Sequence, residues 1–464
     1  MKTVTKKACY VAILLAMIIP VSSCKGGGKA VSESLFVWDE AGEDFAVIRH
    51  GIPAYNGIGY LYRRDGKALL EVELQAPVVV AVADKPEKWG YFQFPGFYRS
   101  AEGWLVATWQ MKDDSPSSYG KSGSGFRISQ DNGKTWYASD GRAPAGSDDS
   151  KGLFLPATGD RISGRTPVAL NVKDLQLPAP VDSNKRSYNR IFSFYRLNEL
   201  PEALQGVYLN RYDKDGVWSE IHAGLDDPGA LRYSDNDLFP VLWSGDMKLL
   251  PDNSIVTGKY PTFYESESGG VEPSGISFYR STDNGMNWKI QGKIPYRPDL
   301  KVDPNGNKRD IFCYTEPTFE VLFDGTFLCV MRTTDANGNS PMYISRSLDQ
   351  GVNWSPAEPF TPSGVLPRLL QLENGVIVLA SGRPGVQIRF SIDGKGEKWT
   401  DPFEMLPFVN QDVISCGYTR FLVTGPDRFL FIYSDFKYLD PVSGELRKAI
   451  KVREIIVTKT NLEI

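Results

Sequence analysis

The chain has 464 residues and a formal net charge of -4, and no block of basic residues interrupts it. This charge balance excludes nucleic acid as a partner, because binding to phosphates needs a concentrated basic surface. Aromatic residues make up 12% of the chain, alongside 44 glycines and 31 prolines, and no long stretch has apolar residues at helical spacing. We therefore expect an all-β fold of short strands joined by tight turns.

The N-terminus has the layout of a secretory signal. Three lysines within the first seven residues precede an apolar run from Ala8 to Val21, which is too short for a permanent membrane helix. The run is followed by V-S-S-C, which resembles a bacterial lipoprotein signal and implies that Cys24 carries the lipid. The alternative is an ordinary signal peptide cleaved near a cysteine. We predict a signal over residues 1–24, a flexible tether over 25–31, and a protein either lipid-anchored in the Gram-negative cell envelope (outer membrane or periplasm) or secreted.

One eight-residue turn recurs along the chain. It reads S-T-D-N-G-M-N-W at 281–288, and its Asp, Gly and Trp each have a structural role in the turn. Asp can hydrogen-bond the backbone ahead of it, Gly can take a positive φ, and Trp can bury a large ring beside the turn. Further copies lie at 129–136 and 347–354, and a looser copy lies at 391–399. The turn resembles the Asp-box (BNR) repeat of the sialidase (neuraminidase) superfamily, which implies a six-bladed β-propeller.

The repeats divide the remaining chain into predicted blades of one domain over residues 32–464. Strands before residue 88 open this domain, and one of them is expected to pair with the last strand of the chain. A second blade without the turn would contain an insertion near residues 144–228. The other predicted blades span residues 91–136, 238–288, 311–354, 365–399 and 415–458.

Cysteine and histidine are too sparse for a metal centre. After the signal only Cys313, Cys329 and Cys416 remain, and their spacing matches no metal motif. We expect all three to be small buried residues, with a disulfide between Cys313 and Cys329 left open. His50 and His222 are the only histidines. No metal and no cofactor are therefore predicted.

A hairpin in the fourth predicted blade carries a Glu and an Arg that we expect to be neighbours. Glu316 lies eight residues before the turn at Asp324-Gly325, and Arg332 lies sixteen residues after Glu316. Both ends of a two-stranded hairpin return to the same edge of the sheet, so the two side chains would lie side by side. The alternative is a surface ion pair. The pattern resembles the exo-sialidase site, which implies that Arg332 binds a sugar carboxylate and that Glu316 is a catalytic base.

Two later segments resemble the same family. S-G-R-P-G-V-Q-I-R-F-S-I-D implies that Arg383 is a second substrate-binding arginine, and S-C-G-Y-T-R-F-L implies that Tyr418 is the catalytic nucleophile. Taken alone, a Tyr on a strand more often packs in the core. A neutral phenol suits a sugar whose anomeric carbon bears a carboxylate, because a carboxylate nucleophile would be repelled. Arginine supplies a planar, always-charged fork for that carboxylate.

The first predicted blade contributes the acid and a departure from the family pattern. Its polar loop at 111–126 contains Asp113 and Asp114, and Asp114 lies nearest the position of the family's catalytic acid. F-Q-F-P places Gln93 where the family has another carboxylate-binding arginine. An amide donates a hydrogen bond without charge, and loss of a charge-assisted contact weakens binding by about 1.5 to 3 kcal/mol. The sugar is therefore expected to be sialic acid or a related acidic sugar.

These residues predict an exo-acting glycoside hydrolase that removes a terminal acidic sugar, sialic acid or a related ulosonic acid, with retention. Two alternatives stay open: a polysaccharide lyase acting on a uronate, and a non-catalytic surface glycan-binding lipoprotein. Contact between Glu316 and the Tyr418 hydroxyl, with an Asp opposite, would favour an enzyme. The expected partner is an acidic glycan, with membrane attachment only through the N-terminal lipid, and the chain is expected to be a monomer.

Overall fold

The computed structural model describes residues 36–40, 47–49, 52–54, 57–62, 68–85, 89–100, 102–121, 123–141, 143–144, 152–243, 245–334, 340–406 and 413–460. The predicted signal, the tether and Cys24 lie outside these residues. The described part is mostly β-strand, as predicted, and its helices are short 3-10 turns. These turns are η2 (Pro116–Ser118), η3 (Val172–Asp174), η4 (Leu197–Glu199), η5 (Glu202–Leu204) and η6 (Gly306–Lys308). None of the described helices is long and apolar enough to cross a membrane.

Three small antiparallel sheets follow the predicted repeat closely. The first contains β7 (Tyr91–Arg99), β8 (Leu105–Met111) and β9 (Ser124–Ser129). The second contains β23 (Tyr314–Val321), β24 (Phe327–Thr333), β25 (Met342–Ser347) and β26 (Glu358–Thr361). The third contains β27 (Val365–Gln371), β28 (Ile377–Gly382), β29 (Val386–Ser391) and β30 (Phe403–Leu406). In each sheet, strands adjacent in sequence are also adjacent in space.

The middle of the chain forms one thirteen-stranded sheet instead of separate blades. Its strands are β10 (Leu153–Leu155), β11 (Asp160–Gly164), β12 (Leu170–Asn171), β13 (Asp182–Ser187), β14 (Arg190–Arg196), β15 (Val207–Tyr212), β16 (Trp218–Asp226), β17 (Ala230–Asp235), β18 (Leu238–Phe239), β19 (Met247–Leu249), β20 (Ile255–Tyr264), β21 (Gly275–Ser281) and β22 (Asn287–Ile294). Short edge pairings, β16 with β22 in parallel and β17 with β20, join antiparallel groups that would otherwise be separate. Much of the region near 144–228 is therefore regular strand.

The two ends of the chain share a seven-stranded sheet. It contains β1 (Phe36–Glu40), β4 (Gly57–Tyr62), β5 (Ala68–Leu74), β6 (Val78–Val82), β31 (Thr419–Gly425), β32 (Arg428–Leu439) and β33 (Leu446–Lys459). A separate two-stranded sheet pairs β2 (Val47–Arg49) with β3 (Ile52–Ala54). Because β33 pairs with both β5 and β6, the expected pairing of an opening strand with the last strand is confirmed.

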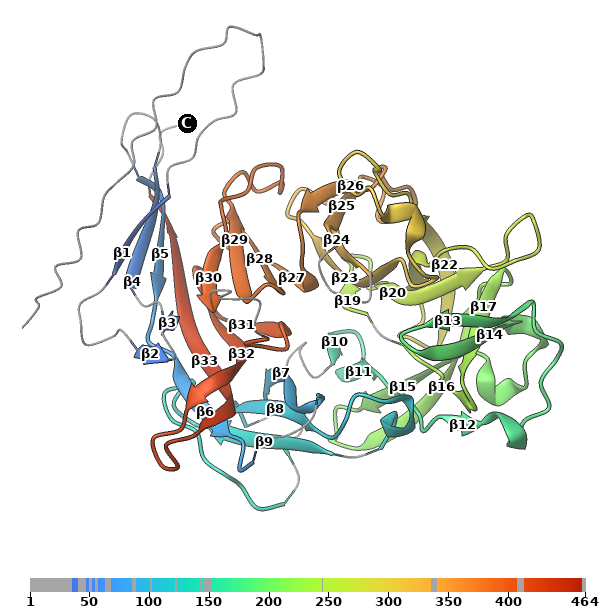
Figure 1. Cartoon of the computed structure of the whole chain (residues 1–464), viewed down its shortest axis with the longest axis horizontal. Coiled ribbons are helices and arrows are strands. Elements are labelled where there is room, and N and C mark those ends of the chain that lie inside the picture. The colour runs from blue at the N-terminus through green and yellow to red at the C-terminus, as the bar shows by residue number, and fades with distance from the viewer. Residues whose placement is uncertain are drawn as a thin grey trace, which may run out of the picture.

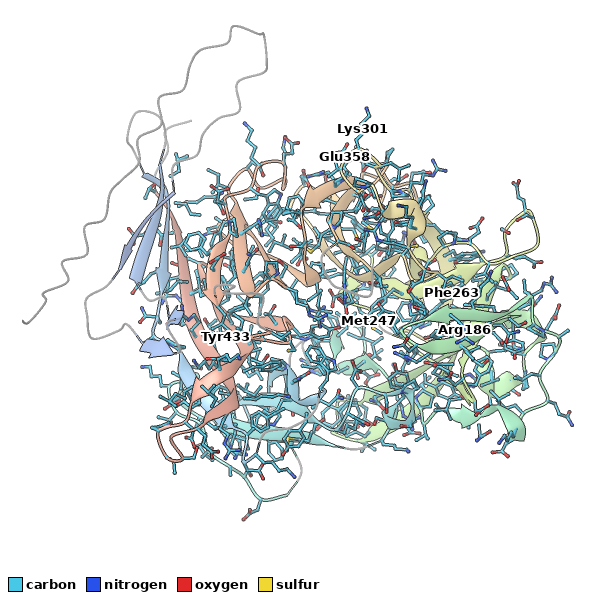
Figure 2. The ribbon with its side chains drawn as sticks, in the orientation of Figure 1. Arg186, Met247, Phe263, Lys301, Glu358 and Tyr433 are labelled. Carbon is cyan, nitrogen blue, oxygen red and sulfur yellow. The ribbon has the colours of Figure 1, made fainter. Side chains whose placement is uncertain are left out.

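Apolar cores lie between sheets that follow one another in the chain. One core joins β7 and β8 to β32 and β33, and another joins the β27–β30 sheet to β32, β33 and β5. Further cores join the β23–β26 sheet to β27 and β28 on one side and to β20 and β21 on the other. Figure 1 shows the sheets arranged about a common centre. In Figure 2, Met247 lies near this centre, whereas Lys301 and Glu358 lie at the periphery.

The four repeated turns share a hydrogen-bonding pattern that explains their sequence. In the turn at 281–288, the Ser281 hydroxyl donates to Asp283 and accepts from the backbone of Gly285, and the Trp288 indole donates to the Gly285 carbonyl. The same three bonds recur at 129–136 and 347–354. The looser turn at 391–399 keeps the first and last of them. The repeated residues are therefore structural.

The described cysteines are Cys313, Cys329 and Cys416, and all three are buried and free. Burial raises the pKa of the Cys313 thiol to about 12 and that of Cys416 above its usual value. The prediction of small buried residues is confirmed, and the disulfide between Cys313 and Cys329 is not formed.

Candidate active site

Four strands carry the same interruption, a residue followed by proline and then a shift of register. The pairs are Phe94-Pro95 in β7, Tyr260-Pro261 in β20, Glu316-Pro317 in β23 and Leu366-Pro367 in β27. Proline has no backbone N–H for the ladder, and such bulges re-aim the neighbouring side chain. Phe94, Glu316 and Leu366 take positive φ values of 53°, 48° and 40°. The bulges thus set the directions of side chains from several sheets.

Glu316 is the centre of a buried polar cluster. The Tyr418 hydroxyl donates a hydrogen bond to Glu316 Oε1. Arg332 Nη1 lies 3.1 Å from Glu316 Oε2, and the backbone N–H of Leu366 donates to the same oxygen at 2.8 Å. Glu316 and Arg332 are only 6% and 8% exposed. The predicted contact between them is therefore confirmed, but as a buried pair and not as a surface one.

The electrostatics of the cluster keep the proton on the phenol. Burial and the charge of Glu316 together raise the pKa of Tyr418 well above its usual value. Burial alone would raise the pKa of Glu316, but the charge of Arg332 and hydrogen bonds from Tyr418 and Leu366 hold it below the usual value. Burial opposes the charge of Arg332, yet Glu316 raises the pKa of that guanidinium. The resting state is thus a neutral phenol donating to a carboxylate.

Tyr418 is positioned by a close approach of two backbones. Gly417 has φ +78°, and a Cβ added at Gly382 would lie 2.1 Å from the Gly417 Cα, so neither position accepts a side chain without movement. The Tyr418 ring packs against Phe94 with ring centroids 4.8 Å apart. Arg383 donates to the Cys416 carbonyl through Nε and Nη2, at 3.3 and 3.2 Å. Two glycines therefore allow Arg383 and Tyr418 to come from neighbouring sheets.

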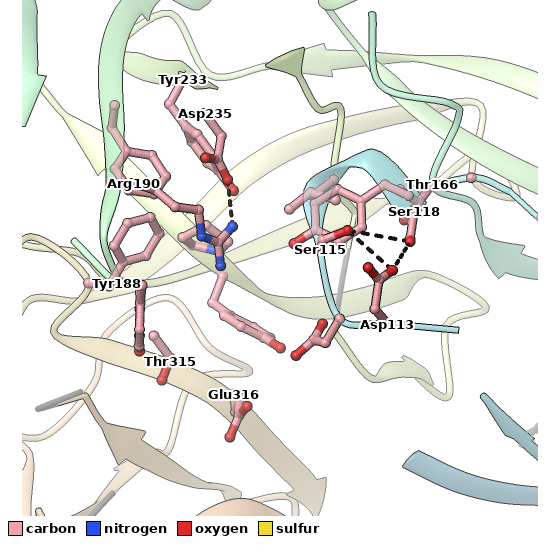
Figure 3. A pocket seen from close by; sticks show the side chains of 18 of the residues that line it. Asp113, Ser115, Ser118, Thr166, Tyr188, Arg190, Tyr233, Asp235, Thr315 and Glu316 are labelled. Atoms are coloured by element: carbon pink, nitrogen blue, oxygen red, sulfur yellow. Dashed lines mark hydrogen bonds and ion pairs between the residues drawn. The ribbon is translucent and has the colours of Figure 1, made fainter. Parts of the chain in front are cut away.

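Asp113 and Asp114 have different environments. Asp113 accepts from the hydroxyls of Ser115 and Ser118, at 3.3 and 2.5 Å, within its own loop (Figure 3). Asp114 is exposed, yet the surrounding protein removes much of its water and raises its pKa above the usual value. A hydrogen bond from Trp89 offsets part of this effect. Asp114 is therefore the more suitable of the two to hold a proton near neutral pH.

A cavity of about 420 Å³ joins these groups. Asp114, Glu316 and Arg332 line it together with residues from η2, β14, β17 and β20. Tyr418 and Arg383 are not among its lining residues, but Tyr418 donates to Glu316, and Arg383 donates to the Cys416 carbonyl two residues before Tyr418. The structure therefore brings Tyr418, Glu316 and Arg332 together, with Asp114 on the wall of the same cavity and Arg383 beside the Tyr418 segment.

A hairpin that the sequence did not reveal forms another wall of this cavity. Ser187 pairs with Arg190, which leaves a two-residue turn at Tyr188-Asn189 between β13 and β14. Tyr188 and Asn189 have φ values of 50° and 61°, as two-residue hairpins require. Tyr188 and Arg190 line the cavity, and Arg190 Nη1 lies 2.6 Å from Asp235 Oδ2 (Figure 3). The asparagine before a short alternating run was the only local sequence signal.

Gln93 does not reach the cavity. Its side chain is fully buried, and its Oε1 accepts from the backbone N–H of Gly90 at 2.9 Å. Its Nε2 has no hydrogen-bond partner among the described residues. Phe94 is the residue of this strand that contacts Tyr418. The predicted substrate-binding position of Gln93 is therefore not brought together with the other predicted residues.

The arrangement suits nucleophilic displacement with acid assistance. It combines a hydroxyl nucleophile, a carboxylate that can take its proton, and an arginine that orients this carboxylate. A carboxyl group with a raised pKa lies on the loop across the cavity. Among the described residues, no group of three His, Cys, Asp or Glu side chains is placed to hold a metal ion.

The chain is similar to several solved structures at low sequence identity. No family model and no curated protein sequence matches the chain. A protein of unknown function from Dyadobacter fermentans aligns with a TM-score of 0.52 and 17% identity, over 83% of this chain and 99% of that chain. A Hadza microbial sialidase aligns at TM-score 0.44 and 16% identity, over 87% and 73% of the two chains. An α-L-arabinanase from Penicillium chrysogenum aligns at TM-score 0.44 and 14% identity, over 82% and 98%. The first alignment indicates a shared fold.

Proposed function

We propose that the protein is an exo-acting glycoside hydrolase that removes a terminal acidic sugar with retention of configuration. The observation that carries this proposal is the hydrogen bond from the Tyr418 hydroxyl to Glu316, whose other oxygen is paired with Arg332. A half-buried Tyr bonded to a buried, arginine-paired carboxylate that lines a cavity is costly for a purely structural contact. It favours an enzyme over the non-catalytic glycan-binding alternative.

In the first step, the Tyr418 oxygen would attack the anomeric carbon while its proton passes to Glu316. Asp114 would donate its proton to the leaving oxygen, so that the glycosidic bond breaks and a tyrosyl–sugar bond forms. In the second step, Asp114 would take a proton from water, and the water oxygen would displace Tyr418. The phenolate then recovers its proton from Glu316. Each residue returns to its starting protonation state.

The proposed substrate is a sugar with a carboxylate on the anomeric carbon, such as sialic acid or a related ulosonic acid. Arg332 pairs with the carboxylate that accepts from Tyr418, and Arg383 donates to the Cys416 carbonyl two residues before Tyr418, so two guanidinium groups lie near the nucleophile. A neutral phenol avoids the repulsion that a carboxylate nucleophile would meet with this sugar. The sialidase family, which the sequence resembles, has a third carboxylate-binding arginine at the position of Gln93, and here Gln93 is buried. The sugar carboxylate would therefore be held without a third arginine. A related ulosonic acid is for this reason as good a candidate substrate as sialic acid.

We further propose that the sheets form a six-bladed propeller. The antiparallel groups would be β7–β9, β10 with β11, β15 and β16, β19–β22, β23–β26, β27–β30, and β31–β33 with β6. Cores between successive sheets and the pairing of β33 with β6 support this arrangement. The strands β12, β13, β14, β17 and β18 would then be an addition that supplies the Tyr188–Arg190 hairpin.

We also propose that lipid on Cys24 anchors the enzyme in the cell envelope. The apolar run and the small residues before Cys24 support this proposal. Metabolic labelling with a fatty acid analogue tests it: label should enter the wild-type chain and be absent from Cys24→Ala. Equal labelling of both chains would exclude the anchor.

The central experiment incubates the full chain with fluorogenic sialosides and a panel of other acidic glycosides. On the substrate that responds, Tyr418→Phe should lose at least about 100-fold in turnover, because the nucleophilic oxygen is gone. A fluorinated analogue of that sugar should form a covalent adduct on the peptide containing Tyr418, as found by mass spectrometry. Product with a new carbon–carbon double bond would identify the lyase alternative. Binding without turnover of any glycoside would identify the binding protein.

A further inference from the structure

A second, larger cavity lies on the other side of Glu316 and Tyr260. Its volume is about 1510 Å³, and both residues line the two cavities. The remaining lining comes from different parts of the strands, including Met247 of β19, Arg368 of β27 and Arg420 of β31. Met247 lies near the centre of the molecule in Figure 2. This second cavity, which we call the lower cavity, is therefore central in the fold and distinct from the candidate active site.

Four segments each place a further residue beyond the catalytic cluster, and two of these residues, Arg368 and Arg420, line the lower cavity. Gly96, Thr318, Arg368 and Arg420 follow by two positions Phe94, Glu316, Leu366 and Tyr418, respectively. Their contacts place them together, because a Cβ at Gly96 would lie 3.9 Å from Arg420 Nε, and the Thr318 hydroxyl accepts from the backbone of Leu369, next to Arg368. A layer containing two arginines thus lies directly beyond the catalytic cluster.

The carboxylates in this layer do not balance its cations. Arg368 Nη1 lies 3.0 Å from Asp246 Oδ1, and the Thr318 hydroxyl donates to Asp246 Oδ2 at 2.9 Å. Lys248 lies 2.8 Å from Glu320, so that pair is neutral as well. Arg420 has no hydrogen bond or ion pair within the part of the chain that the structure describes. Asp246 also attracts Arg420, so two guanidinium groups share one carboxylate.

The two guanidinium groups are close enough to oppose each other. The charge of Arg368, followed by burial, lowers the pKa of Arg420 to about 10. The Nε of Arg368 is also buried without a hydrogen-bond partner among the described residues. Buried N–H donors and an uncompensated charge are both unfavourable unless an acceptor meets them. Two neighbouring guanidinium groups with unused N–H donors match the acceptor geometry of a carboxylate or a sulfate.

We propose that Arg368 and Arg420 form an oxyanion-binding site in the lower cavity, separate from the catalytic site. Its ligand is a sulfate, phosphate or carboxylate group, either as a free ion or carried on a sugar. A cavity of about 1510 Å³ has room for a sugar, and Phe154 and Trp218, which are 40% and 44% exposed, line it. Such rings can pack against the face of a sugar. This proposal does not rest on the proposed hydrolase activity, since none of its residues takes part in that reaction.

Calorimetric titration of the full chain with sodium sulfate tests the site, in a zwitterionic buffer free of other anions. We expect saturable binding of one sulfate by the wild type and a dissociation constant about tenfold higher or more in Arg420→Gln, which leaves the Arg368–Asp246 pair intact. Arg428→Gln is the matched control, because Arg428 pairs with Asp427 on the surface of β32. It should bind sulfate like the wild type. Competition by glucuronate would indicate a sugar carboxylate as the ligand, and its absence would indicate a sulfate or phosphate group.

The wild type alone supplies an independent measurement if Arg420→Gln fails to fold. Phenylglyoxal modifies accessible arginines, and mass spectrometry locates the modified peptides. Sulfate should protect Arg420 while leaving the modification of Arg428 unchanged. Absence of saturable sulfate binding in the wild type, wild-type affinity in folded Arg420→Gln, or absence of protection would each overturn the proposal.

Discussion

Replacing Glu316 by Gln tests the central cluster through both activity and stability. The amide keeps the size of the side chain and removes its charge. Arg332, which is 8% exposed, then loses its counter-charge. Removing one partner of a buried ion pair typically destabilises a protein by about 3 to 5 kcal/mol. The amide oxygen can still accept from the backbone of Leu366, so we expect the lower end of this range, about 3 kcal/mol.

The effect on turnover should be larger than the effect on folding can explain. The Tyr418 proton would have no carboxylate to receive it, and loss of a positioned base typically costs about 10²- to 10⁴-fold. Glu320→Gln is the matched control, because Glu320 lies on the same strand and pairs with Lys248 in the lower cavity. Denaturant unfolding gives the stability, and turnover is measured where both variants are folded. If Glu316→Gln hydrolyses the substrate as fast as Glu320→Gln, the assigned base is wrong.

Three further predictions concern the acid, a backbone contact and a repeated turn. The raised pKa of Asp114 should appear as an alkaline limb of kcat/KM, since activity needs the protonated acid, and Asp114→Asn should remove this limb from the pH profile. Gly382→Ala would place a methyl group against the Gly417 backbone and should destabilise the chain by about 1 to 3 kcal/mol by thermal unfolding, whereas Gly229→Ala, with 3.7 Å to its nearest neighbour, should not. Hydrogen bonds from Thr135 lower the pKa of Asp131 to about 2, so its stabilising contribution is complete above about pH 4 and is lost as pH falls towards 2. The unfolding midpoint of Asp131→Asn should therefore depend less on pH between about pH 4 and pH 2 than that of the wild type. The same pH dependence in both chains would contradict the stabilising role of the Asp131 carboxylate.

Local sequence rules predicted the parts of the site that regular hairpins position. Glu316 and Arg332 lie at the open end of a β23–β24 hairpin whose turn is marked by Asp324-Gly325, so their contact follows from counting residues. The four turns were predicted because the bonds that they share depend on a few residues that are close in sequence. Tyr418 required the resemblance to a family, because its contact with Glu316 joins residues 102 positions apart.

Irregular backbone explains what sequence reasoning missed. In β7, register shifts occur on both sides of Gln93, and Phe92 and Phe94 have positive φ. Each bulge changes the face of the strand on which the following side chains lie. The alternation of side chains along the sequence therefore does not predict that Phe94 faces Tyr418 while Gln93 is buried. The β13 strand has exposed polar residues and almost no apolar alternation, which is why Arg190 in the adjoining hairpin was not predicted.

The bulges also link the candidate site to the packing of whole sheets. A non-glycine residue at positive φ costs on the order of 1 kcal/mol or more, and it persists only where its surroundings fix it. Glu316 at φ 48° is held by Leu366, itself at φ 40° on the neighbouring sheet, and by Tyr418 from a third sheet. None of these contacts is available within the β23–β24 hairpin alone. The carboxylate therefore reaches its bonded position only when three sheets are packed together, so correct assembly of the sheets is a condition for the proposed chemistry.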